Sequence, residues 1–182
     1  MNPEHKILDL KRLVESDKRS EIRLNANGGN SILLVCPPDQ ELVYVTNINK
    51  MLDKEIYDVI DLNEILINYV RANKDEIVEL FELLKGSIHQ IFKSPGNEIE
   101  SDLFSQIITR IQKSFDLNKI PVLLHSGSLY GSGIDNIHLM EHEMVMKSKY
   151  PLVILYPASQ DGEKLMFLNS RPASKYRCMI IN

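Results

Sequence analysis

The sequence contains little cysteine and no long apolar run. Its 182 residues include two cysteines, Cys36 and Cys178, each within a short apolar segment. A disulfide framework is therefore not expected, and two buried free thiols are typical of a protein that stays in a reducing compartment. The apolar runs are only a few residues long, whereas a membrane-spanning helix needs roughly 20 apolar residues. A membrane protein is not expected.

An excess of positive charge is also missing. The chain carries 21 Lys and Arg against 25 Asp and Glu, which gives a formal net charge of −4. Because nucleic-acid-binding domains usually present a basic surface, direct nucleic-acid binding by the isolated protein is not expected. Residues 1–18 are too polar to hold the apolar core of a secretory signal. The expected location is therefore the cytoplasm.

A phosphate-binding loop is missing after the first predicted strand. Residues 36–41 read Cys-Pro-Pro-Asp-Gln-Glu. A phosphate loop needs glycines for close approach of the backbone, together with a Lys and a Ser or Thr. The prolines remove N–H donors, and two carboxylates would repel phosphate. A degenerate nucleotide-binding domain remains only as an alternative.

Apolar runs alternate with amphipathic segments along the chain. Runs typical of strands lie at 32–36, 56–62, 120–124, 152–156, 164–168 and 176–181. Helical spacing predicts helices at 3–16, 39–52, 63–72, 75–92, 101–115 and 134–147. The connections after 156 are too short for parallel crossovers, so the last two strands are expected to form antiparallel hairpins. The prediction is a single α/β domain over residues 1–182. It is a mainly parallel, Rossmann-like three-layer sheet flanked by helices, with antiparallel hairpin strands at the C-terminal edge.

The loop at 125–133 is rich in glycine and hydroxyl side chains. Such a loop can form an anion-binding nest of backbone N–H groups. The simpler interpretation is a turn followed by a helix cap at Ser132 or Gly133.

Residues 138–142 spell the H-x-x-E-H motif of inverted zincins. On one continuous helix His138 and His142 share a face, which would allow both to bind zinc while Glu141 acts on a bound water. Glu163 is the candidate for a third ligand further along the chain. The alternative is that both histidines face solvent. The leading expectation is that the protein needs no metal and no cofactor and is not an enzyme. A zinc-dependent hydrolase is the alternative.

The ends of the predicted strands carry aromatic residues. Tyr130 and Tyr156 follow or end parallel strands, so they are expected at one edge of the sheet, near the start of the last strand. Tyr and Arg are frequent anchors of protein interfaces. We therefore predict a partner-binding or loop-organising group made of Tyr130, Tyr156, Pro157, Tyr176 and Arg177. The alternative is that the tyrosines only pack the end of the sheet.

The C-terminal third resembles the BrxB family of BREX anti-phage defence systems. The residues that carry this resemblance are Pro121 to Leu124, Gly127, Leu129, Tyr130, Pro151 to Val153, Tyr156, Pro157, Gly162, Leu165 to Leu168, Tyr176 and Arg177. The strand-end sequence Cys36-Pro37-Pro38 with Glu41 is also similar to the family. Gly131 departs from it, because many members have proline there, and so do residues 158–160.

The resemblance implies a role within an assembly. BREX islands also encode an adenine-specific DNA methyltransferase, a large AAA+ ATPase and the phosphatase-like protein PglZ. The role implied for this chain is a non-catalytic scaffold that binds PglZ, with the ATPase and the methyltransferase as further partners.

Overall fold

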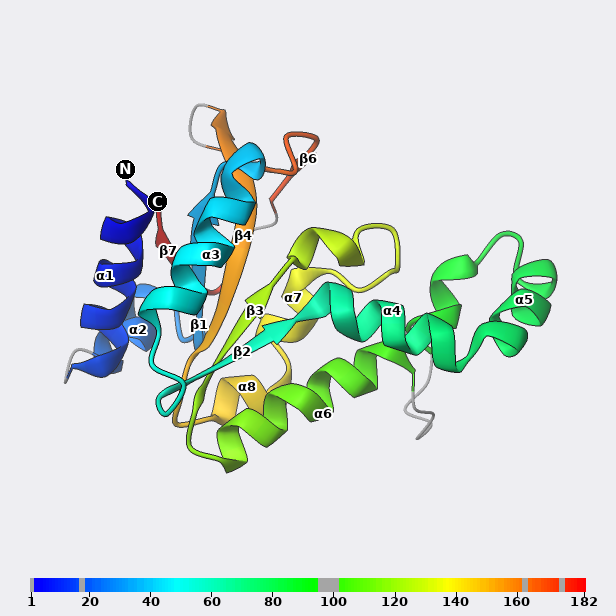
Figure 1. Cartoon of the computed structure of the whole chain (residues 1–182), viewed down its shortest axis with the longest axis horizontal. Helices are drawn as coiled ribbons and strands as arrows, with labels where there is room; N and C mark the ends of the chain where they lie inside the picture. Colours follow the sequence, from blue (N-terminus) through cyan, green and yellow to red (C-terminus); the bar gives the residue numbers. More distant parts are fainter. Residues whose placement is uncertain (1, 17–18, 95–101, 162–163, 174–175) are drawn as a thin grey trace.

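The computed structural model describes residues 2–16, 19–94, 102–161, 164–173 and 176–182. Within these ranges seven strands form one sheet, and five of them pair in parallel in the order β2-β3-β4-β1-β7 (Figure 1). Their bounds are β1 Ser31–Cys36, β2 Tyr57–Asp61, β3 Ile120–Leu124, β4 Leu152–Asp161 and β7 Met179–Ile181. The predicted α/β class with a mainly parallel sheet is confirmed.

Strand β1 shows why the central strands are apolar throughout. All six of its residues are buried. Ile32 and Leu34 belong to one core cluster, whereas Leu33 and Val35 belong to the other. Since successive strand residues point to opposite faces, each face of the sheet must be covered by helices.

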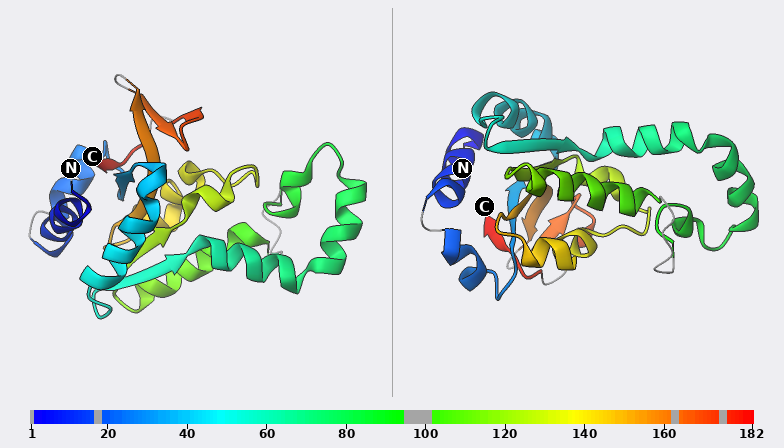
Figure 2. Two further views of the ribbon diagram at one scale, coloured as in Figure 1. Left: turned by 45° about the horizontal axis from the view of Figure 1, so that its top comes forward. Right: turned by 90° about the horizontal axis from the view of Figure 1, so that it is seen from below.

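Two layers of helices provide this cover (Figure 2). On one face lie α1 (Pro3–Glu15) and α3 (Glu41–Met51), with α2 (Arg19–Asn25) beside α1. On the other face lie α4 (Leu62–Ala72), α6 (Leu103–Asp116), α7 (Asn136–Met140) and α8 (Glu143–Lys147). The connection that leaves β1 therefore runs over one face, and the connections that leave β2 and β3 return over the other. In α/β sheets ligands bind at the carboxyl edge near such a reversal.

The antiparallel part of the sheet is smaller than predicted. Strand β5 (Lys164–Phe167) pairs with Ala158–Asp161 of β4, and β6 (Arg171–Pro172) pairs with β5. The prediction for the last strand was wrong: β7 pairs with β1 and runs parallel to it. Strand β4 pairs with one edge of β1, and β7 pairs with the opposite edge.

Two predicted long helices are each divided in two. Instead of one helix at 75–92, α5 (Lys74–Leu83) ends before a turn, and a 3-10 helix, η2 (Ile88–Ile91), follows. Gly86 and Ser87 lie in this turn, and both have low helix propensity. Instead of one helix at 134–147, α7 ends at Met140 and α8 begins at Glu143. Neither Ser132 nor Gly133 caps α7, because Asp135 occupies its N-cap.

The α4–α5 region extends away from the sheet in every view (Figures 1 and 2). It consists of the outer part of α4, α5 and η2, which we call the helical arm (residues 67–91). The N-cap of α4 is Asp61, the last residue of β2, whose carboxylate accepts the N–H groups of Asn63 and Glu64. Helix α4, which leads into the arm, therefore starts directly at the carboxyl edge of the sheet.

Candidate functional site

The candidate site lies where β1 and β3 end and β4 continues. Strand β1 ends at Cys36 and β3 at Leu124, whereas β4 runs on to Asp161 and pairs with β5. After β3 a 3-10 helix, η3 (Ser126–Leu129), leads into the loop that contains Tyr130. This extension of β4 and the loop after β3 form the two sides of the site.

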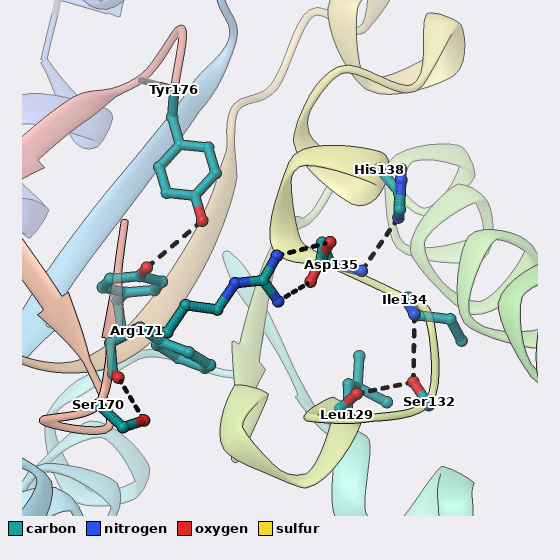
Figure 3. A network of polar contacts seen from close by, with 10 residues as sticks. Leu129, Ser132, Ile134, Asp135, His138, Ser170, Arg171 and Tyr176 are labelled. Carbon is teal, nitrogen blue, oxygen red and sulfur yellow. Dashed lines mark hydrogen bonds and ion pairs between the residues drawn. The ribbon is translucent and has the colours of Figure 1, made fainter. Parts of the chain in front are cut away.

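Tyr156 is the buried centre of the site. Its side chain is fully buried, and its ring stacks on that of Phe167 with centroids 4.8 Å apart. The ring of Tyr176 meets it edge-on at 6.1 Å, and the two hydroxyl oxygens lie 3.4 Å apart (Figure 3). Burial and then the Tyr176 hydroxyl raise the pKa of Tyr156 well above its ordinary value. Tyr156 is therefore a neutral hydroxyl at physiological pH.

Tyr130 lies at the rim of the same group. Tyr130, Tyr156 and Tyr176 line one small cavity of about 20 Å³, a volume that fits a group the size of a water molecule. Tyr130 is 57% exposed, so most of its ring faces solvent. The structure thus brings together three of the five residues predicted for this edge.

The cavity also contains a buried acceptor. Asn136 is only 6% exposed, and its Oδ1 has no hydrogen-bond partner among the described residues. Ser126 lines the same cavity, and its hydroxyl donates to the carbonyl of Leu155 at 2.9 Å. A buried acceptor without a donor costs about 1–3 kcal/mol. Asn136 therefore carries an unsatisfied acceptor beside the cavity.

An ion pair joins the two sides of the cavity. Arg171 of β6 donates from Nη1 to Oδ1 of Asp135 at 3.0 Å, and its Nη2 lies 3.5 Å from Oδ2 (Figure 3). The Ser132 hydroxyl donates to the carbonyl of Leu129 at 2.7 Å and accepts the N–H of Ile134. The loop after β3 is thus held at both ends. The sequence pattern did not indicate Arg171 as a residue of this site.

Arg177 and Pro157 lie outside this cavity lining. Arg177 pairs with Glu141 through Nε at 3.2 Å and Nη2 at 3.3 Å. Asp135 pairs with Arg171 instead, and Glu163, the candidate third zinc ligand, lies outside the described residues. The backbone of Arg177 packs on Gly29, where a Cβ would come within 1.7 Å of its carbonyl oxygen. Pro157 is part of the sheet, and its carbonyl accepts the N–H of Leu168 at 2.9 Å.

A second polar group at this edge was not predicted from the sequence. His125 follows β3 with a left-handed backbone (φ 56°), and its Nδ1 lies 3.0 Å from Oδ1 of Asp61. Glu41 interacts electrostatically with both residues. Burial raises the pKa of Glu41, although His125 opposes the shift, and the Glu41 Oε1 has no hydrogen-bond partner within the described ranges. The signal in the sequence was that Asp61 and His125 each end or follow a parallel strand.

The two histidines of the H-x-x-E-H motif do not share one helix. His138 lies in α7, where its Nδ1 accepts the N–H of Asp135 at 3.0 Å. His142 is the N-cap of α8, where its Nδ1 accepts the N–H of Met144 at 3.3 Å. Burial lowers the pKa of both imidazoles. Glu141 is engaged by Arg177.

Among the described residues there is neither a cluster of metal ligands nor a helix that could span a membrane. In the described part of the chain, no three or more His, Cys, Asp and Glu side chains are grouped so that they could hold a metal ion. A larger cavity of about 560 Å³ lies between α6 and α8 and is lined by His142 and Tyr150 but not by Tyr130, Tyr156 or Tyr176. Over the described ranges, no helix has the length and apolar character needed to cross a membrane.

Comparison with family models, with curated proteins and with solved structures finds no match to this chain.

Proposed function

We propose that this protein is a non-catalytic scaffold of a BREX phage-defence complex and that it binds the phosphatase-like protein PglZ. Two features support this role: the sequence resemblance and the exposure of Tyr130. Tyr130 is 57% exposed at the rim of a cavity that is lined by buried tyrosine. An aromatic side chain of this kind buries a large area on binding at a low cost in conformational entropy.

The surroundings of Tyr130 favour an interface over a flexible loop. The ion pair between Arg171 and Asp135 connects β6 to the start of α7 on either side of the cavity. Ser132 anchors the loop within two residues of Tyr130. Because the site is already ordered, a partner that contacts Tyr130 loses little binding free energy to ordering the loop.

The direct test is co-purification from the native operon. Tagged wild-type protein is expected to retain PglZ. Tyr130→Ala is expected to retain at least tenfold less PglZ while remaining folded. Leu117→Ala is the matched control, since Leu117 is also 57% exposed but lies just after α6. If the wild-type protein retains no BREX component, the proposed function is wrong.

Metal analysis separates the scaffold from the competing zinc hydrolase. A hydrolase that uses His138 and His142 requires stoichiometric zinc, and His142→Ala would abolish it. Elemental analysis of the purified wild-type protein and of this variant measures both. Zinc that is bound by the wild type and lost in the variant would overturn the proposal.

A further inference from the structure

The helical arm presents an apolar surface that the rest of the described chain does not cover. None of the ten residues of α5, all of which are described, is buried. Val78 is 60% exposed, Phe81 49% and Leu83 78%. Monomeric proteins rarely expose large contiguous apolar patches unless these patches bind something.

The exposed residues continue into a groove on the same helix. Ile77 and Leu80 are half-buried and line a cavity of about 310 Å³ together with Tyr69 of α4 and Ile91 of η2. Successive residues of an α-helix are rotated by about 100°, so Val78 and Phe81 lie next to Ile77 and Leu80 around α5. Together with Ile77 and Leu80, these exposed residues form an apolar strip along α5. The other residues of the groove lining besides Tyr69 and Ile91 are polar: Asn73, Glu76, Gln90, Ser94 and Asp102.

Negative charge borders this strip. Helix α5 carries Asp75, Glu76, Glu79 and Glu82 against Lys74, and Lys85 just after the helix pairs with Glu82 at 2.8 Å. Glu76 also lines the groove. Its carboxylates therefore repel phosphate groups, which argues against both nucleic acid and an anionic membrane as the occupant.

We infer that the helical arm is a second docking surface, whose occupant is a basic amphipathic helix of a partner protein. A helix matches a groove of this kind when its apolar residues, spaced three or four apart, enter the groove. Lys or Arg on the borders of that helix would face the carboxylates of α5, which adds specificity and speeds association. Since α5 is about 15 Å long, about three turns of the partner helix make contact.

This inference rests on the proposed function and deepens it. The residues of α5 and of η2 do not line the tyrosine cavity, although His89 of η2 packs against Gly133 in the loop after β3. The chain would then offer two surfaces, which is what a scaffold needs to join two segments or two components.

The first experiment compares arm variants within the native assembly. Phe81→Asp is expected to lower the recovery of at least one BREX component tenfold or more. Leu42→Asp is the matched control, because Leu42 is 73% exposed on α3 and lies on another part of the surface. Circular dichroism checks that both variants fold. If Phe81→Asp fails to fold, Glu76→Lys reverses the charge at the groove without burying a new group.

The second experiment identifies the occupant. A photo-crosslinking amino acid replaces Val78 in the tagged full-length chain, and mass spectrometry maps the crosslinked segment. A segment with apolar residues at helical spacing and an excess of Lys and Arg supports the inference. A second copy of this chain, an acidic segment or a nucleic acid at this position overturns it.

The outcomes distinguish this inference from the proposed function. If the arm variants retain every component as the wild type does, the docking surface is wrong and the proposed function stands. If the wild-type protein retains no component, the proposed function is wrong and the inference is overturned with it.

Discussion

Truncation of two tyrosines distinguishes binding from packing at the carboxyl edge. Tyr156 is fully buried, so Tyr156→Ala removes a complete ring from the core and is expected to lower the free energy of unfolding by about 3–5 kcal/mol. Tyr130 is 57% exposed, so less than half of its ring area is shielded from water. At about 25 cal/mol per Å² and about 200 Å² for a tyrosine, Tyr130→Ala is expected to cost about 2 kcal/mol.

Tyr156→Phe is the conservative control for this pair. It keeps the stacking on Phe167 and removes only the hydroxyl, whose contact with Tyr176 is long at 3.4 Å. The expected loss is about 1 kcal/mol or less. The three values should therefore fall in the order Tyr156→Ala, Tyr130→Ala, Tyr156→Phe.

Urea denaturation followed by circular dichroism measures these free energies, and co-purification with PglZ measures binding. If Tyr130 contacts PglZ, the Tyr130→Ala variant loses binding while it keeps most of its stability. A Tyr130→Ala variant that unfolds as readily as Tyr156→Ala would show that Tyr130 serves packing. Full stability together with full binding would show that Tyr130 has neither role.

Three further predictions concern titratable groups. A hydrogen-bonded ion pair with Arg110 holds the pKa of Asp58 below its ordinary value, so the stability from this pair is present above about pH 4 and is lost as pH falls through the lowered pKa. Asp58→Asn should cost about 2 kcal/mol at pH 7 and less at pH 3 in urea titrations; an equal loss at both pH values contradicts this. Burial raises the pKa of Glu41, so Glu41→Gln should increase stability at pH 7 and change little below pH 4; a lower melting temperature at pH 7 would show that its carboxylate is stabilised. Burial raises the pKa of Cys36 and Cys178 to about 12. A disulfide reagent should therefore modify both thiols slowly in the folded protein and rapidly in urea. Fast labelling without urea would refute their burial.

Local patterns predicted much of the framework correctly. The apolar runs that became β1, β3 and the first half of β4 are unbroken because both faces of these strands are buried, and burial on both sides leaves no polar alternation. The helical spacing in α1, α4 and α6 predicted their bounds to within a few residues. Each of these signals depends on residues that are neighbours in the sequence.

Breaks within long apolar patterns were missed. The spacing from 75 to 92 continues across Gly86, but the chain turns there and forms η2. The pattern from 134 to 147 continues across His142, whose side chain instead caps α8. Hydrophobic spacing indicates which side of a segment is apolar. It does not indicate whether the segment forms one continuous helix.

What the sequence alone determined was the α/β class, most of the strands and the presence of tyrosines near the strand ends. Tertiary structure alone decided which charged groups meet: Arg171 with Asp135, Arg177 with Glu141, and His125 with Asp61. It also decided that β7 joins β1 in parallel. The physical reason is that each of these contacts joins residues more than 30 positions apart, and local propensity carries no information about such pairs.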